Sequence, residues 1–544
     1  MTGFHDSATL DFEEPRKRVT VIQAPANARP AVLDWIERAL PVSFFEPDGS
    51  GDPDALDGAL VLDPERLADA PRHVPRLVLA ARAHGQAETG LVALSEDRRL
   101  ARPIRGRSIS ESATLGKLEP QPRRGGDVLA RAGDEPLWWE ARESSASLYY
   151  SRYPLAELAD GQTLREYLRA GAFMGLLPLL QFLGELLGEE GWTSPAPRAA
   201  FVIDDPNLHW PSYGYLKYRE LATHAMHHGY HLGFATVPLD GWRAEPRAVA
   251  LVRDNPAALS LLIHGNDHVA RELARLSTDE QAEQAMAQAL RRIVALERRT
   301  GLSVARVMAP PHGACSEAAL RAMFRLGFDA ACISRPYPWR DGLPAPTPLA
   351  GWHPAELVAG GIPVAPRHPL SAAREDLPFR ALLGQPLILY GHHDDFSGGL
   401  DLLAQASADI NSLGEVRWGS LGSVAGGGYA TRRLGDTLLV RMYARKVSIA
   451  LPEGVGALRI LAQEPLGGAG WHGVCHAGGV TGMAFADGMG VSASLPVHAP
   501  STLDLELVTN RPLDSREVAA PALRPWPLIR RLLVEGRDRV QPLV

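Results

Sequence analysis

The sequence predicts an α/β fold in which a central parallel sheet or barrel, covered by helices, lies between an N-terminal α/β domain and a C-terminal β-sandwich. Three observations support this prediction. Residues 199–412 alternate short apolar runs with helical segments, and residues 18–104 do the same on a smaller scale. Residues 415–510 lose helical periodicity, contain frequent glycine and carry short alternating runs such as TLLVRMYA and KVSIAL. A length of 544 residues suits several domains of ordinary size.

The central region is the most regular part of the chain. Its apolar runs have the length of buried strands: AAFVID, HLGFATV, LSLLIH, ARVMAP, FDAACIS and PLILYG. Helical segments lie between several of them. The longest, STDEQAEQAMAQALRRIVALERRTG, is expected to begin with a Ser277/Glu280 capping box and to end at Gly301. Because parallel strands need such crossovers, the strands are expected to run parallel, with the working residues at their C-terminal ends.

Changes in composition divide the chain into segments, and the proline-containing TSPAPR marks the start of the central one. The last segment contains ALRPWPLIRRLLVEGRDRV, a basic amphipathic helix for which packing against the protein is favoured over membrane binding. The expected segments are a disordered N-terminus (1–17), an α/β domain with short strands at its end (18–150), a helical connector (151–198), the central domain (199–412), a β-sandwich (413–512) and a C-terminal helix or tail (513–544).

Composition excludes several classes of function. The net charge of −7, with both signs mixed, gives no broad basic surface for nucleic acid. The cysteines Cys315, Cys332 and Cys475 are widely spaced, which argues against a thiolate zinc site and a disulfide scaffold. The N-terminus lacks an apolar signal region, and the apolar stretch 171–187 contains Pro, Gln and Glu. A cytoplasmic protein without a transmembrane helix is therefore expected.

Acidic and histidine residues gather at the ends of the predicted strands. Alone, each group has an ordinary explanation, such as an Asx turn, a helix start or a solvated loop. Together, at successive strand ends, they indicate one site, because one carboxylate and two imidazoles form a facial ligand set for a divalent metal. Such a metal lowers the pKa of its bound water to about 7. The residues concerned are Asp204, Asp205, His264, His268, the APPHG loop (309–313), His392 and His393.

The order of these motifs resembles the polysaccharide deacetylase superfamily: Asp-Asp, then H-x-x-x-H, then a Pro-x-Gly loop, then Leu-x-x-His. The resemblance covers about 200 residues of the central region. It implies a distorted (β/α) barrel and the removal of N- or O-acetyl groups from a carbohydrate or polysaccharide with a divalent metal, most often Zn²⁺.

The resemblance also implies a role for each matching position. Asp204 would be the general base and His392 the general acid. The metal ligands would be Asp205, His264 and His268. Substrate and oxyanion contacts would come from Pro311, His312 and Gly313, with the His312 N–H facing the oxyanion.

One departure from the family pattern concerns the residue that orients the base. The family has an arginine there, whereas this chain has Ala309. Arg335, just after FDAACIS, is a hypothetical replacement from the next strand end. Trp339 is a candidate to stack on a sugar ring, with core or rim packing as the equal alternative. His393 is an alternative acid.

Two other functions stay open at the level of sequence. A glycoside hydrolase on the same scaffold would need paired carboxylates, such as Asp204 with Asp394 or Asp395, at about 5–5.5 Å or about 6.5–9.5 Å. A catalytically silent glycan-binding protein is the second alternative, to which the Ala309 departure and the extra domains give weight. Absence of a metal would favour either alternative over the deacetylase.

Overall fold

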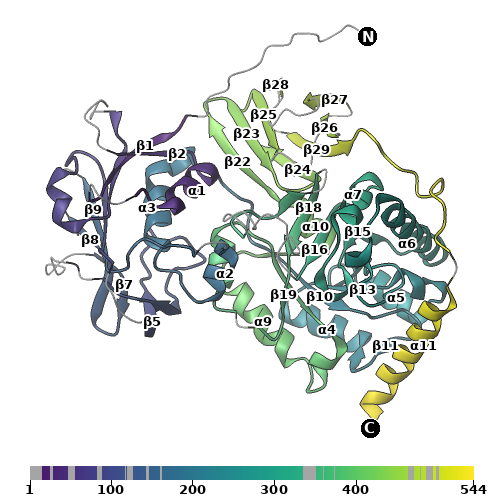
Figure 1. Ribbon diagram of the computed structural model, residues 1–544. Coiled ribbons are helices and arrows are strands. Elements are labelled where there is room, and N and C mark those ends of the chain that lie inside the picture. Colours follow the sequence, from purple (N-terminus) through teal and green to yellow (C-terminus); the bar gives the residue numbers. More distant parts are fainter. Residues whose placement is uncertain are drawn as a thin grey trace, which may run out of the picture.

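The computed structural model describes residues 15–24, 28–46, 55–82, 88–116, 118, 127–142, 146–159, 162–334, 351–358, 361–372, 374–462, 471–477, 480–485, 494–497, 501–522 and 524–543. Figure 1 shows an N-terminal α/β part at the left, a helix-covered barrel at the right and further β-sheets above it. The expected disordered N-terminus, 1–17, lies almost wholly outside the described residues. No helix in the described part of the chain has both the length and the apolar character needed to cross a bilayer.

The N-terminal part is built on a sheet with the strand order β2-β1-β3-β4-β9-β8-β7-β5-β6. The five strands β2, β1, β3, β4 and β9, in this order, pair in parallel. The remaining pairs, β9 with β8, β8 with β7, β7 with β5 and β5 with β6, are antiparallel. Their bounds are β1 Lys17–Ile22, β2 Val42–Phe45, β3 Gly58–Val61, β4 Arg76–Leu79, β5 Glu88–Leu94, β6 Ser108–Ala113, β7 Asp127–Ala132, β8 Glu135–Arg142 and β9 Ser147–Ser151.

Three helices cover this sheet: α1 (Ala31–Ala39), α2 (Leu164–Arg169) and α3 (Leu177–Leu187). Their apolar side chains belong to the same hydrophobic cluster as the strand residues. The segment expected to be a helical connector therefore contributes to the N-terminal core as well as linking it to the barrel.

The central part confirms the prediction of a parallel barrel-like sheet. Its strand order is β17-β18-β16-β15-β14-β13-β10-β20-β19, with β21 added beside β10. Neighbouring strands pair in parallel except β17 with β18. The bounds are β10 Arg198–Asp204, β13 Leu232–Thr236, β14 Leu259–Ile263, β15 Val304–Met308, β16 Ala330–Ile333, β17 Glu356–Val358, β18 Ile362–Pro366, β19 His368–Pro369, β20 Leu387–Gly391 and β21 Arg417–Trp418.

One short segment nearly closes the barrel. Strand β18 pairs with β16, and β19 pairs with β20 at the opposite edge of the sheet. Only Arg367 separates β18 from β19 along the chain. Residues 362–369 therefore join the two edges, and Arg367 lies at this seam.

Helices surround the barrel, and their apolar faces complete its core. The longest, α6, ends at Gly301 in the left-handed region, as predicted. The predicted Ser277/Glu280 capping box is wrong, because the helix begins one residue later, after Thr278, whose side chain accepts the Gln281 N–H. The helices are α4 Tyr218–His228, α5 Pro246–Asp254, α6 Asp279–Thr300, α7 Glu317–Arg325, α8 Leu377–Leu382, α9 Asp401–Asn411 and α10 Leu421–Gly426.

After the barrel, the chain forms two four-stranded sheets, ordered β22-β23-β25-β28 and β24-β29-β26-β27 within the described residues. Apolar residues of both sheets belong to the cluster that also fills the barrel core. Whether they form a β-sandwich stays a prediction. The strands are β22 Tyr429–Leu434, β23 Thr437–Met442, β24 Lys446–Leu451, β25 Ala457–Ala462, β26 Trp471–Ala477, β27 Val480–Phe485, β28 Leu495–Pro496 and β29 Ser501–Thr509.

The last helix, α11 (Pro525–Val540), returns to the barrel. It lies beside the small hairpin of β11 (Ser212–Tyr213) and β12 (Leu216–Lys217), as the yellow ribbon in Figure 1 shows. This hairpin follows directly after the Asp-Asp motif, so α11 reaches the rim on which the predicted site lies.

Candidate functional site

The two adjacent aspartates lie at the C-terminal end of β10, whose residues are all buried. Asp204 is the last strand residue, and its side chain is only 3% exposed. Asp205 follows in the left-handed region, with φ of 80°. A non-glycine residue there costs roughly 1 kcal/mol or more, and such residues cluster at functional sites.

Positive φ marks the other predicted motifs as well. Among the described residues, the non-glycine positions with positive φ are Asp205, His268, Arg271 and His312. Three of these four belong to the motifs at the strand ends. Backbone strain is therefore concentrated at the site predicted from the sequence.

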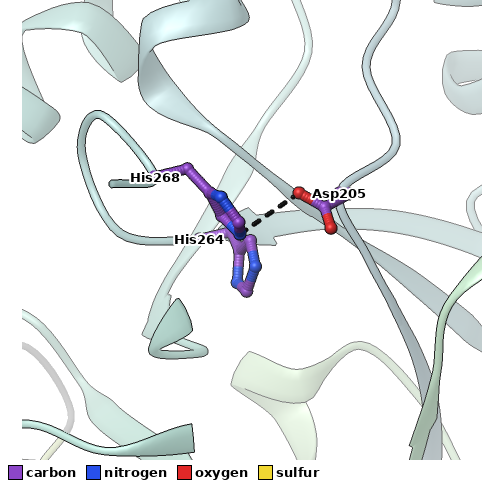
Figure 2. A group of neighbouring side chains, drawn as sticks. All are labelled: Asp205, His264 and His268. Atoms are coloured by element: carbon purple, nitrogen blue, oxygen red, sulfur yellow. Dashed lines mark ion pairs between the residues drawn. The ribbon is translucent and has the colours of Figure 1, made fainter. Parts of the chain in front are cut away.

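Asp205, His264 and His268 form a cluster that suits a metal ion (Figure 2). One ligand atom from each residue lies within 4.8 Å of the others. His268 Nε2 is 3.3 Å from Asp205 Oδ1, and the two imidazole rings are 4.9 Å apart between centroids. His264 Nδ1 lies 2.7 Å from the Ala309 carbonyl oxygen, to which it donates, so its Nε2 carries the lone pair.

The protonation states of this cluster suit a cation. Burial lowers the pKa of His264 and lowers that of His268 to about 3, so both imidazoles are neutral near pH 7. Burial alone would raise the pKa of Asp205, but His268 and Arg531 outweigh it and hold that pKa below its usual range. One carboxylate and two neutral imidazoles are a donor set that Zn²⁺ accepts.

Asp204 is held by a buried arginine. Arg367 Nη1 donates to Asp204 Oδ1 over 2.6 Å, and the Arg367 side chain is 1% exposed. Burial alone would raise the pKa of Asp204, but the charge of Arg367 and the hydrogen bond that it donates outweigh burial and lower that pKa. Asp204 is therefore an ionised carboxylate in a fixed orientation, as a base requires.

Arg367 was missed by the sequence reasoning, which placed the orienting cation at Arg335. Arg335 and Trp339 lie outside the described residues, so their roles stay predictions. Arg367 follows IPVAP, a run whose prolines are unusual within a strand. The only sequence signal was an arginine directly after a short apolar run, at another strand end.

His392 and His393 point to different surroundings after β20. The His392 side chain is 51% exposed, and its Nε2 lies 4.0 Å from Asp204 Oδ2. Its backbone N–H donates to the Asp395 carboxylate over 2.8 Å. His393 is buried, with Nε2 3.5 Å from Asp538 of α11. His392 therefore opens toward solvent beside Asp204, whereas His393 contributes to a contact between elements.

The Pro-rich loop packs against the metal cluster. Pro311–Gly313 forms one 3₁₀ turn in which Pro311 and Gly313 are buried and His312 is exposed. The rings of His312 and His268 are 5.8 Å apart between centroids. At Gly313, φ is 72° and a Cβ atom would lie 1.7 Å from Ser334 Oγ, so only glycine fits.

A buried glutamate shapes the loop between the two histidines. The Glu272 carboxylate accepts backbone N–H bonds from Asn266, Asp267 and His268 over 2.8–3.1 Å. This arrangement fixes the turn that brings His268 back over His264. The sequence reasoning did not single out Glu272, because an acidic residue four positions past a motif is also ordinary for a loop surface.

The C-terminal helix supplies a second buried cation to the site. Arg531 Nη1 lies 3.0 Å from Asp205 Oδ1, and its guanidinium also pairs with the buried carboxylate of Asp240. The Arg531 side chain is 2% exposed. Residues 326 positions apart thus meet, and no local pattern predicts such a contact.

Comparisons with known proteins find solved structures that are similar to this chain at low sequence identity. No family model and no curated protein matches this chain. Agd3, a carbohydrate deacetylase of solved structure, is 10% identical with a TM-score of 0.49, covering 91% of this chain and 99% of its own.

Two further solved structures are similar to part of the chain. A family 4 carbohydrate esterase from Streptomyces lividans, in complex with acetate, is 12% identical with a TM-score of 0.24, covering 41% of this chain and 88% of its own. The catalytic domain of a peptidoglycan N-acetylglucosamine deacetylase from Eubacterium rectale is 11% identical with a TM-score of 0.23, covering 42% and 92%. Because all three TM-scores are below 0.5, the proposals that follow rest on the residues of this chain.

Proposed function

We propose that this protein is a metal-dependent hydrolase that removes acetyl groups from a carbohydrate. The observation that carries the proposal is the cluster of Asp205, His264 and His268, whose ligand atoms lie within 4.8 Å of one another. Directly beside it, Asp204 is buried and paired with Arg367. The ordered motifs of the sequence support a sugar acetyl group, N- or O-linked, as the substrate.

The three clustered side chains would hold the divalent ion, with Zn²⁺ the best match to two imidazoles and a carboxylate. When bound, such an ion activates water and polarises a carbonyl oxygen. A bond from Arg367 fixes the Asp204 carboxylate, which accepts the proton of the attacking water. His392, exposed and 4.0 Å from Asp204, donates a proton to the leaving sugar nitrogen or oxygen.

The Pro-rich loop contributes to substrate binding in this proposal. Its turn lies against His268, and the His312 N–H is assigned to the developing oxyanion. Gly313 lets the backbone approach closely, as its contact with Ser334 requires. Substrate would enter on the side where His312 and His392 are exposed.

The proposal is tested by metal analysis of the purified protein together with acetate release from a panel of acetylated glycans. We expect one divalent ion per chain, loss of that ion in His264→Ala, and retention of the ion with a fall of roughly 10²–10⁴-fold in turnover in Asp204→Asn. Normal turnover of Asp204→Asn would refute the assignment of the base. Release of reducing ends without acetate, by metal-free protein, would instead support the glycoside hydrolase.

A further inference from the structure

Helix α11 buries charged side chains and exposes apolar ones, the reverse of what is usual for a helix that covers a globular core. The residues that it buries against the barrel include Arg531, Glu535 and Asp538, at a spacing that places them on one face. Six of the eleven strongly exposed large apolar side chains among the described residues lie on this one helix. They are Trp526, Leu528, Ile529, Leu532, Leu533 and Val540, between 42% and 64% exposed.

Paired charges fix this orientation of α11. Arg531 pairs with Asp240 and Asp205, as described above. Glu535 Oε2 lies 2.8 Å from His209 Nδ1, and the Tyr213 hydroxyl donates to Asp538 over 2.7 Å. Turning the helix over would leave buried charges without partners, which is strongly unfavourable. The outward apolar face is therefore a stable feature of the fold.

The exposed charge on α11 has one sign. Both of its carboxylates, Glu535 and Asp538, face the barrel, whereas Arg524 at its start and Arg537 near its end are exposed. The Arg537 side chain is 69% exposed, although its guanidinium also pairs with Asp538 over 2.6 Å. The chain as a whole carries a net charge of −7. The outer surface of α11 is thus apolar with positive charge at both ends, in contrast to the negative balance of the remaining chain.

An apolar cavity continues this face beneath the helix. It has a volume of about 530 Å³. Its lining is mostly apolar and includes Leu528 and Leu532 of α11 and Leu239, Trp242 and Ala295 of the barrel, with Arg292 and Arg299 as the charged members. Trp242 is itself 55% exposed. Leu528 and Leu532 of the exposed face of α11 thus also line this cavity together with Trp242 of the barrel.

We propose that α11 docks this protein on the surface of an anionic lipid bilayer, with the helix lying in the plane of the interface. Exposed Trp and Leu side chains would enter the headgroup region while Arg524 and Arg537 attract anionic lipid. A symmetric contact between two copies is less suitable, because two such faces would bring the arginines of both helices together. The inference goes beyond the proposed hydrolase function and does not depend on it.

Docking of this kind would place the candidate site close to the membrane. The inner face of α11 touches Asp205, and its outer face would touch lipid. A helix with its side chains is about 10–12 Å across. The Asp205 cluster would therefore lie roughly one helix diameter above the bilayer surface, within reach of headgroups or of glycans attached to the membrane.

The test is cosedimentation of the full chain with vesicles of phosphatidylcholine alone and of phosphatidylcholine mixed with phosphatidylglycerol. We expect binding to the mixed vesicles that weakens with added salt. The double variant Leu532→Ser/Leu533→Ser should weaken binding at least about tenfold, since it removes two apolar side chains from the interface. Leu91→Ser is the matched control, because Leu91 is equally exposed, at 65%, but lies on β5.

A second variant covers the case in which the leucine changes disturb folding. Arg524→Gln, which leaves the pair between Arg537 and Asp538 intact, should lower affinity for the mixed vesicles about fivefold and leave the circular dichroism spectrum unchanged. Failure of the full chain to bind any vesicle would overturn the proposal, as would equal binding by wild type and both α11 variants. Dimerisation without lipid that Leu532→Ser/Leu533→Ser abolishes would also overturn it, in favour of a second copy as the partner.

Discussion

The candidate base illustrates how burial and charge compete at a single residue. Asp204 is almost fully buried, and burial alone favours its neutral form. The charge of Arg367 and the hydrogen bond that it donates reverse this preference. The ionised state and the orientation of the carboxylate thus depend mainly on one guanidinium that the sequence motifs did not identify.

Replacement of Arg367 should reveal this dependence in the pH profile. In Arg367→Met the buried Asp204 loses its cation, so its pKa rises and the acid limb of kcat/KM should move to higher pH. Arg367→Lys keeps the charge and should leave that limb nearly in place, while kcat falls about 10²-fold through misplacement of the carboxylate. The measurement is kcat/KM for acetate release from about pH 4 to about pH 9. Because the pKa of Asp204 is lowered in the wild type, its acid limb lies at or below the start of this range, and that of Arg367→Met should appear within it. Identical acid limbs in wild type and Arg367→Met would contradict the role of Arg367.

Gly313 offers a test of the Pro-rich loop with an internal control. Gly313→Ala should lose about 1 kcal/mol from its positive φ and roughly 1–3 kcal/mol more from the clash with Ser334. Gly301→Ala has a similar φ of 70° but nothing within 4 Å of the added Cβ, so only the first loss applies. Denaturant unfolding measures both, and Ser334→Ala should partly rescue Gly313→Ala. Equal losses in the two glycine variants would show that the loop tolerates a side chain.

Between elements, a buried glutamate joins the N-terminal sheet to the segment before α3. The Glu111 carboxylate of β6 accepts backbone N–H bonds from Phe173 and Met174 over 2.9–3.2 Å. Burial raises the pKa of Glu111 to about 7. The packing of α3 on this sheet therefore depends on the protonation of one carboxyl group.

Stability of this junction should fall as pH rises. Below pH 4.5, the pKa of this carboxyl group in the unfolded chain, Glu111 is protonated in both the folded and the unfolded protein. Above pH 4.5 the unfolded chain loses the proton first, which favours unfolding. This effect ends near pH 7, where Glu111 of the folded protein also ionises. The shift of about 2.5 pH units corresponds to about 3 kcal/mol. Glu111→Gln lacks this decline, so its Tm relative to wild type should increase from pH 5 to pH 8. A constant difference in Tm would contradict the prediction.

The elements divide clearly into those that the sequence could predict and those that it could not. The strands that carry Asp204, His264 and His392 are continuous apolar runs, and their parallel arrangement brings these residues to one rim. Strands β18 and β19 are short and rich in proline, so local pattern gave no strand there and Arg367 was missed. The contact of Arg531 with Asp205 spans most of the chain, and only tertiary packing determines it.

At the scale of the whole molecule, the barrel shares its core with the sheets that follow it. Leu438 and Val440 of β23 and Leu505 of β29 belong to the same hydrophobic cluster as the barrel strands. The buried Arg445 donates to the carbonyl oxygens of Phe328 and Leu507, which ties β29 to the loop before β16. The central region is therefore not enclosed by its own residues alone.

A fragment of the barrel alone should consequently fail to fold. We expect residues 198–412 to be insoluble or to lack near-ultraviolet circular dichroism, because the shared core and the Arg531 pairs are missing. Residues 198–543, which restore both, should give soluble protein with a cooperative thermal transition. Comparable cooperative unfolding of the two fragments would show that the barrel is an independent unit.

The seam formed by residues 362–369 has a further consequence. Because Arg367 lies where the two sheet edges meet, its guanidinium reaches Asp204 only after β18 and β19 have both found their partners. A chain with an unclosed barrel therefore has an Asp204 carboxylate that Arg367 does not orient. If Asp204 is the base, as proposed, completion of folding and acquisition of activity coincide at Arg367, and partly folded molecules would be inactive.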